Sequence, residues 1–133
     1  MPDQIIQNPL ILVVDDEPDF REIFGTKLRA EGYRVETAEN GETGLKKIKD
    51  LKPDLVLMDV KMPIMDGATA VLKMRDDPDM KDIKVAFLTS LGDPRLEMQE
   101  INEKFSKQFG AQGYLKKTDD LDVLCEKIKE FLA

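Results

Sequence analysis

Apolar runs and amphipathic helical patterns alternate five times along this chain. Each apolar segment is followed by apolar residues spaced three or four apart, which is typical of a helix with one buried face. The segments that we expect to form strands are LILVV (10–14), RVETA (34–38), LVLM (55–58), VAFL (85–88) and GYLK (113–116). Five consecutive strand–helix units predict a parallel sheet with helices on both faces.

The character of each segment indicates its place in the sheet. Strands buried on both faces are unbroken apolar runs, whereas edge strands can alternate or carry charge. The first, third and fourth segments are unbroken, the second alternates, and the fifth contains Lys116. The second and fifth strands are therefore predicted at the edges. This fits the strand order 2-1-3-4-5 of the flavodoxin-like class, an α/β three-layer sandwich.

The predicted helices have recognisable ends. The first opens at Pro18 and closes before Gly32, Asn40 is a good N-cap for the second, and Asp93 followed by Pro94 opens the fourth. The apolar residues at helical spacing are Phe20, Ile23, Phe24 and Leu28; Leu45, Ile48 and Leu51; Ala68, Val71 and Leu72, expected to face inward; Met98, Ile101, Phe105 and Phe109; and Leu121, Leu124, Cys125, Ile128 and Leu132. On that last stripe, Cys125 is predicted to pack in the core.

Length and composition indicate one globular domain. The chain has 133 residues, 41% hydrophobic and 35% charged, and we assign 1–133 to a single domain with a core of about 10–132. It has no apolar stretch near the roughly 20 residues that cross a bilayer, and its N-terminus lacks the features of a secretion signal. We therefore expect a cytoplasmic protein that does not bind membranes. The net charge of −7 argues against nucleic-acid binding, which normally requires a basic face.

The residues that follow the strands carry the candidate chemistry. In an open parallel sheet, ligands bind beyond the carboxyl ends of the strands, near the point where strand order reverses. The polar residues at these ends are Asp15, Asp16 and Glu17 after the first strand, Asp59 after the third, Thr89 and Ser90 after the fourth, and Lys116 and Lys117 at the fifth. Taken singly, each is most simply a cap or a solvated loop residue. Together they fall on one edge of the sheet.

That set of groups suits phosphoryl transfer. Three gathered carboxylates repel one another unless a cation intervenes, and the chain has no His and only one Cys. Oxygen ligands select Mg²⁺, Ca²⁺ or Mn²⁺, and a cytosolic setting favours Mg²⁺. A lysine and a hydroxyl could hold the other phosphoryl oxygens, and one carboxylate could act as nucleophile. We therefore predict a phosphoaspartate.

Four segments resemble the receiver domain of two-component response regulators, of the stand-alone chemotaxis and sporulation-relay type. They are ILVVDDEPDFRE, LVLMDVKMPIMDG (55–67), VAFLTS and GAQGYLKK, and the resemblance covers about 11–132. It puts the phosphoacceptor at Asp59, the switch hydroxyl at Thr89, the switch aromatic at Tyr114 and the essential lysine at Lys117. Because the chain begins with Met and ends with the fifth helix, we expect a stand-alone receiver, and a receiver cut from a longer protein is the alternative.

The resemblance implies a role for each position. Asp16 and Asp59 would bind Mg²⁺ directly, the main-chain carbonyl of Lys61 would be a third ligand, and Asp15 would act directly or through water. Lys117 would pair with a phosphoryl oxygen.

Phosphorylation would then act as a switch. Thr89 would move toward the phosphoryl group and Tyr114 would turn inward. The change would reshape the face made by the fourth helix, fifth strand and fifth helix, where a downstream protein would bind. The phosphoryl donor would be a histidine kinase or a phosphotransfer protein.

The chain departs from the family pattern at three places. The usual proline after the lysine is Thr118, so we expect a trans peptide bond there. The 27 residues between Thr89 and Lys117 exceed the usual spacing by several residues. Lys61 and Leu91, each two residues past a site residue, flank the pocket and could tune the lifetime of the phosphate.

Three other functions remain open at this point. A Mg²⁺-dependent phosphohydrolase usually needs an acid or base at the position of Lys61. A flavin or nucleotide binder would place an anion at the acidic, glycine-free loop DDEPDF, which would repel it. The complete acidic set argues against a phosphate-independent scaffold, but the departure at Thr118 keeps that alternative open.

Overall fold

A computed structural model of the chain describes residues 8–62, 64–90 and 110–133. Its five-stranded parallel sheet has the order β2-β1-β3-β4-β5, as predicted. The strands are β1 (Leu10–Val14), β2 (Arg34–Ala38), β3 (Leu55–Asp59), β4 (Lys84–Thr89) and β5 (Gly113–Lys116). The helices are α1 (Pro18–Ala30), α2 (Gly41–Leu51), α3 (Gly67–Asp76) and α5 (Leu121–Leu132). The helix predicted after Asp93 lies outside the described residues.

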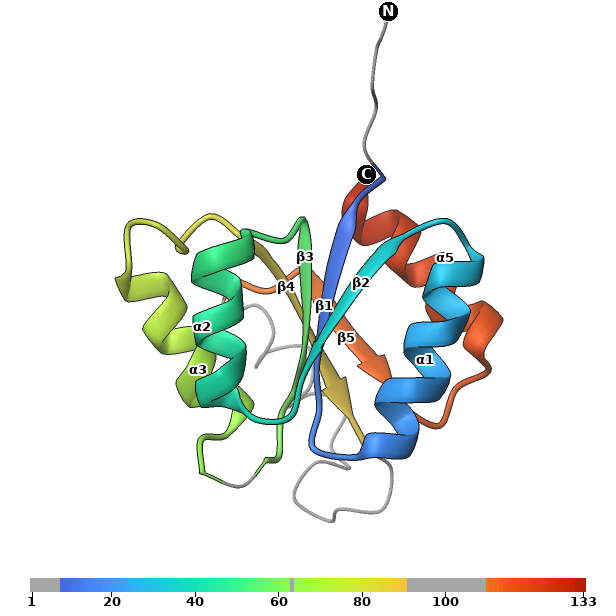
Figure 1. The fold of residues 1–133 in the computed structure, drawn as a ribbon, viewed down its shortest axis with the longest axis horizontal. Coiled ribbons are helices and arrows are strands. Elements are labelled where there is room, and N and C mark those ends of the chain that lie inside the picture. Colours follow the sequence, from blue (N-terminus) through green and yellow to red (C-terminus); the bar gives the residue numbers. More distant parts are fainter. Residues whose placement is uncertain (1–7, 63, 91–109) are drawn as a thin grey trace, which may run out of the picture.

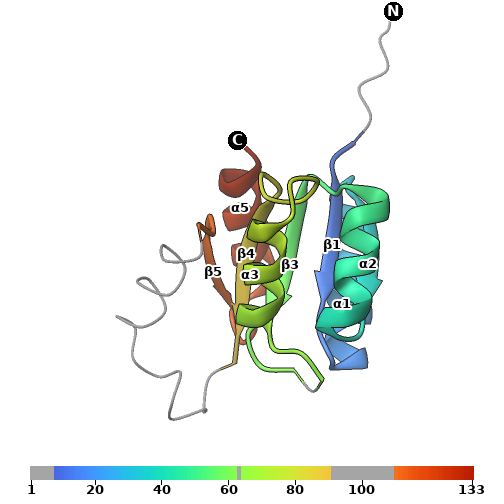
Figure 2. The same cartoon turned by 90° about the vertical axis from the view of Figure 1, so that its left-hand side faces the viewer.

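Helices cover both faces of the sheet, giving three layers (Figures 1 and 2). Helices α1 and α5 lie on one face, and α2 and α3 lie on the other. The alternating side chains of the central strands pack into both layers. Ile11, Val13, Leu55 and Leu57 pack on the α1 and α5 side, while Leu12, Val14, Val56 and Met58 pack on the other. The unbroken apolar runs follow from this burial on two faces.

Local capping sets the helix ends that were predicted. The side chain of Asn40 accepts a hydrogen bond from the N–H of Thr43, which confirms it as the N-cap of α2. Pro18 occupies the first turn of α1. Cys125 is buried in the core with the α5 stripe, as predicted. The described residues contain no cis peptide bond, so the bond to Thr118 is trans.

Three side chains that the apolar pattern placed on buried helix faces are exposed instead. Ile23 of α1 is 57% exposed, Leu72 is 52% exposed and Leu51 is 42% exposed. Helix α3 buries Ala70, Val71 and Met74, and the turn of about 100° per residue places Leu72 on the opposite side. Leu51 is the last residue of α2, where the chain leaves the helix. The apolar pattern identified these three helices correctly but not the limits of their buried faces.

The strands end at the residues that matter for function. Strand β3 is one residue longer than predicted and includes Asp59, and β4 ends at Thr89. The carboxyl ends of β1, β3 and β4 lie at one edge of the sheet, at the bottom of Figure 1. In the part of the chain that the structure describes, no helix has the length and apolar character needed to span a bilayer.

Candidate phosphoacceptor site

The end of β1 supplies two aspartates with different surroundings. The N–H of Asp15 donates to the carbonyl of Ala38 at 3.0 Å, which continues the pairing of β1 with β2. Its carbonyl accepts from Nη1 of Arg21 at 2.6 Å, and its Oδ1 accepts from the N–H of Glu17 at 2.8 Å. These bonds hold the Asp15 side chain inside the protein, whereas Asp16 is exposed.

The end of β3 presents Asp59 in a tightly closed loop. Its Oδ1 accepts from the N–H of Lys61 at 3.2 Å, so the backbone of Lys61 lies beside the carboxylate. The N–H of Val60 donates to the carbonyl of Leu88 at 3.1 Å, and the N–H of Gly67 donates to that of Val60 at 3.0 Å. A Cβ at Gly67 would lie 2.2 Å from the carbonyl oxygen of Asp59, so only glycine fits there.

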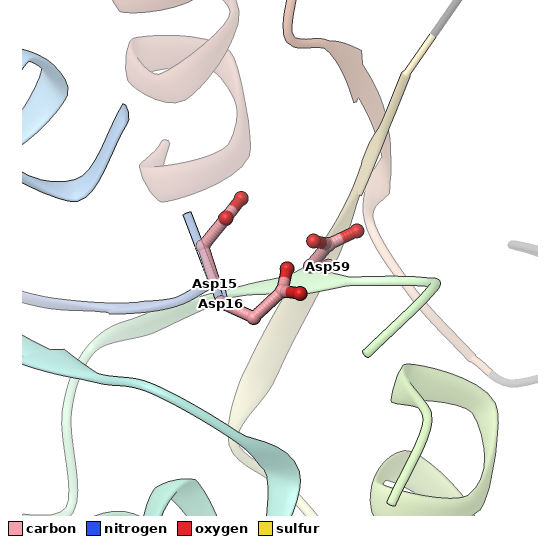
Figure 3. Close-up of side chains that lie close together, drawn as sticks. All are labelled: Asp15, Asp16 and Asp59. Carbon is pink, nitrogen blue, oxygen red and sulfur yellow. The ribbon is translucent and has the colours of Figure 1, made fainter. Parts of the chain in front are cut away.

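Three carboxylates meet at this edge. One oxygen from each of Asp15, Asp16 and Asp59 lies within 4.8 Å of the others. Figure 3 shows the carboxylates of Asp16 and Asp59 turned toward one another, with Asp15 beside them. Asp15 and Asp59 are almost completely buried, at 0% and 4% exposure, and Asp16 opens the group to solvent. The sequence prediction that these residues come together is therefore confirmed.

Lys117 is the lysine that enters the group. Its N–H donates to the carbonyl of Thr89 at 2.8 Å, which fixes the backbone just beyond β5. Its Nζ lies 2.8 Å from Oδ2 of Asp15 and 3.7 Å from Oδ2 of Asp59, and its side chain is only 6% exposed. Lys116 is the last residue of β5 and pairs with Thr89 in the sheet. The structure thus separates the two adjacent lysines that the sequence offered.

Two neighbours of Lys117 received no role from the sequence. Glu17 forms an ion pair and hydrogen bond with Nζ of Lys117, and the ring of Phe20 lies 4.7 Å from the same nitrogen. The ring of Phe20 also packs against Phe24 of the core, with ring centroids 5.2 Å apart and the planes tilted by 46°. A sequence signal existed for Glu17, which follows the acidic pair directly. For Phe20 the helical spacing indicated only core packing.

Thr89 and Tyr114 lie close behind the acidic group. Thr89 is 4% exposed, and its hydroxyl donates a long hydrogen bond of 3.4 Å to the carbonyl of Leu115. Tyr114 is half-buried against the core cluster on the α2 and α3 side. Ser90 is exposed. Leu91 falls outside the described residues, as does most of the long segment between Thr89 and Lys117.

Burial and mutual repulsion dominate the electrostatics. Burial, and after it the charge of Asp15, raise the pKa of Asp59 to about 7, although the nearby Lys117 ammonium lowers it. Burial likewise raises the pKa of Asp15. For Lys117, burial favours the neutral form, but pairing with Asp15 and Glu17 outweighs it and the pKa is raised. The pocket is short of positive charge.

The donor set fits a hard divalent cation. All its side-chain donors are carboxylate oxygens, and two of the three are buried. Oδ2 of Asp15 is buried without a well-aligned hydrogen bond from any described residue, although the Lys117 ammonium lies beside it. Buried carboxylates in this state favour proton or metal binding. A cation here would sit next to a nucleophilic carboxylate and a lysine, as phosphoryl transfer requires.

Residues 11–129 match the sequence model of the response regulator receiver domain. This chain belongs to that family. As a receiver, it is a phosphoryl-accepting switch of two-component signal transduction rather than a conventional enzyme. Its pocket of Asp15, Asp16, Asp59 and Lys117 is the acidic pocket of a receiver.

Individual receivers show how far the similarity extends. Sporulation initiation phosphotransferase F of Bacillus subtilis is 33% identical over 127 residues, which is 96% of each protein. The DNA-binding dual master transcriptional regulator RpaA of Synechocystis is 32% identical over 93% of this chain, which spans about half (49%) of RpaA. A CheY-like receiver domain protein from Methanospirillum hungatei has a TM-score of 0.80 at 32% identity, covering 94% of both chains. The flavodoxin-like class predicted from sequence is thereby confirmed.

Proposed function

We propose that Asp59 accepts the phosphoryl group and that the cation beside it is Mg²⁺. Asp16, Asp59 and the main-chain carbonyl of Lys61 would bind the ion, with Asp15 binding directly or through water. The observation that carries this proposal is the meeting of three carboxylate oxygens within 4.8 Å. When bound, the cation neutralises charge on the carboxylates and on the phosphoryl oxygens.

The transfer is a displacement at phosphorus. A carboxylate oxygen of Asp59 forms the new bond to phosphorus while the bond between phosphorus and the donor atom breaks. The donor keeps that electron pair and is protonated where its chemistry requires it, and Asp59 becomes an acyl phosphate. Lys117, already 3.7 Å from Asp59, would donate to a phosphoryl oxygen. Hydrolysis of the acyl phosphate by water would reset the switch.

Thr89 and Tyr114 would report the phosphorylation. The Thr89 hydroxyl donates to the carbonyl of Leu115 across 3.4 Å, which is a long and weak hydrogen bond. A hydrogen bond to a charged phosphoryl oxygen is stronger, so Thr89 would exchange one acceptor for the other. Movement of Thr89 would free space behind it for Tyr114. The output would be a changed surface over β5 and α5, together with the segment that precedes β5 in the sequence, and a downstream protein would bind there.

The phosphoryl donor would be a histidine kinase or a phosphotransfer protein. The family supports this class of partner, and the similarity to a sporulation phosphotransferase over nearly the full length is consistent with a phosphorelay. We further propose that the protein works in the cytoplasm, where such donors and Mg²⁺ are available.

The test is direct phosphorylation by a small donor. The protein is incubated with Mg²⁺ and acetyl phosphate, and its intact mass is measured. We expect an adduct of about 80 Da that disappears in Asp59→Asn and when Mg²⁺ is removed by chelation. Asp50→Asn, on the exposed face of α2, is the matched control and should label normally.

Two results would overturn the proposal. Absence of an adduct in folded protein at saturating donor would favour a phosphate-independent scaffold. An adduct that persists in Asp59→Asn would assign the acceptor to another residue.

A further inference from the structure

The Lys117 ammonium already has three carboxylates around it before any phosphoryl group arrives. Its Nζ contacts carboxylates of Asp15, Glu17 and Asp59, and the ring of Phe20 lies against it. An ammonium group has three N–H donors and no acceptor. The hydrogen bond that Nζ makes in the described residues goes to Glu17, so a phosphoryl oxygen that approaches Lys117 has to compete with that carboxylate.

The three carboxylates differ greatly in the free energy that it would cost each of them to break its contact with Lys117. Asp15 is 0% exposed, and apart from its ion pair with Lys117 its Oδ2 has no hydrogen-bond partner among the described residues. Asp59 carries the phosphoryl group and cannot leave. The side chain of Glu17 is 61% exposed, so it can turn into water and remain solvated. Glu17 is the partner that exchanges most easily.

The backbone of Glu17 explains why its side chain reaches the pocket. Glu17 is the N-cap residue of α1, but its side chain makes no capping hydrogen bond. Its N–H is instead anchored on Oδ1 of Asp15 at 2.8 Å. Glutamate is not among the favoured N-cap residues, which are Ser, Thr, Asp and Asn. The long side chain is consequently free to cross to Lys117.

We propose that Glu17 is a competing ligand for Lys117, which occupies the ammonium in the resting receiver and must be displaced by the incoming phosphoryl oxygen. The ring of Phe20, whose centroid is 4.7 Å from Nζ, is not displaced in this exchange and would hold the lysine in place. Glu17 therefore sets how readily the receiver is phosphorylated. This inference rests on the proposed function of Asp59.

Two substitutions separate the reach of Glu17 from its charge. Glu17→Gln removes the charge. Glu17→Asp keeps the charge but is one methylene shorter, and aspartate at an N-cap position turns back to its own helix. The matched control is Asp19→Asn, which removes an exposed charge from the first turn of the same helix without contacting Lys117.

The experiment measures phosphorylation and analogue binding in the full chain at saturating Mg²⁺. The initial rate of adduct formation with acetyl phosphate is followed by intact mass, and the half-saturating concentration of beryllofluoride, a phosphoryl mimic, is followed by ¹⁹F NMR. Both Glu17 variants should label faster and bind the mimic more tightly than Asp19→Asn. The gain should be about two- to fivefold, because an ion pair with one solvated partner is weak.

Each outcome decides one question. If wild type is labelled and the Glu17 variants match Asp19→Asn or label more slowly, Glu17 does not compete, and the role of Asp59 stands. If only Glu17→Gln gains, the effect is one of charge and the competing contact is rejected. If wild type neither forms an adduct nor binds beryllofluoride, the proposed function fails and this inference fails with it.

Discussion

Oδ2 of Asp15 lies 2.8 Å from Nζ of Lys117, and the two side chains are 0% and 6% exposed. This pair joins the end of β1 to the residue that follows β5, with β3 and β4 between them in the sheet. It therefore ties together two loops about a hundred residues apart in sequence. In the proposed function the same ammonium group also donates to a phosphoryl oxygen, so Lys117 contributes to both stability and phosphoryl binding.

Loss of the Lys117 ammonium should strongly destabilise the metal-free protein. Lys117→Met leaves Asp15 and Asp59 buried without their counter-ion, and we expect a loss of about 3 kcal/mol in unfolding free energy at pH 8. Urea denaturation followed by circular dichroism measures it. Combining Lys117→Met with Asp15→Asn should recover more than half of the loss, because the uncompensated charge is gone. Equal stability of the single and double variants would show that the ion pair is not the cause.

Asp59 should make the metal-free protein less stable as the pH rises. Its pKa is raised to about 7 in the folded state from 3.8, so between these values the folded protein holds a proton that the unfolded chain has lost. The contribution of Asp59 to the free energy of unfolding is fully present below about pH 4. It falls by about 2–4 kcal/mol in total as the pH rises to about 7.

The variant Asp59→Asn isolates this effect from other titrating groups. The difference in unfolding free energy between Asp59→Asn and wild type should grow in favour of the variant between pH 4 and pH 7 and stay constant above. Added Mg²⁺ at pH 8 should stabilise wild type and have little effect on the variant. A difference that does not vary with pH would mean that Asp59 titrates normally.

The closed loop after β3 requires glycine at position 67. In Gly67→Ala the new Cβ would meet the Asp59 carbonyl at 2.2 Å, a backbone atom that cannot move aside cheaply. We expect a loss of at least about 2 kcal/mol in unfolding free energy and slower phosphorylation, because Asp59 shifts. Gly25→Ala in α1 is the control, since its Cβ would meet other atoms only at 3.6 Å. That change should stabilise the helix by about 0.5–1 kcal/mol. Similar effects at both positions would contradict the steric argument.

The sequence was most informative where local pattern and topology act together. Unbroken apolar runs identified the central strands, and the edge strands followed from Lys116 and the alternation in 34–38. The strand order then placed Asp15 and Asp59 at one edge, because parallel strands end on the same side. These inferences needed only the periodicity of apolar side chains and the rule that consecutive strand–helix units form a parallel sheet.

Contacts between segments that are distant in the sequence were harder to predict. The approach of Glu17 and Phe20 to Lys117 depends on how α1 and the loop after β5 are set against the sheet, which no local pattern records. The choice between the two adjacent lysines depended on a backbone bond from Lys117 to Thr89. Leu72 was misjudged because apolar spacing identifies a helix but leaves its rotation about its axis free by one residue.

Arg75 on α3 joins three segments through backbone carbonyls. Its Nη1 donates to the carbonyls of Lys81 at 2.7 Å and Ile83 at 3.0 Å, and its Nη2 donates to that of Gly110 at 3.1 Å. Gly110 has a φ of 69° and leads into β5. The guanidinium thus connects the turn before β4 with the approach to β5, the strand that presents Tyr114 and precedes Lys117.

Replacing Arg75 by lysine should therefore destabilise the protein although the charge is kept. A single ammonium nitrogen cannot reach carbonyls on both sides as the two guanidinium nitrogens do. Unpaired carbonyls should reduce the unfolding free energy by about 1–3 kcal/mol. Urea denaturation of Arg75→Lys measures this, with Lys73→Met on the exposed side of α3 as the control, expected within about 0.5 kcal/mol of wild type. If Arg75→Lys unfolds at the wild-type urea concentration, these carbonyls are satisfied without the guanidinium, and the connection that it makes does not stabilise the fold.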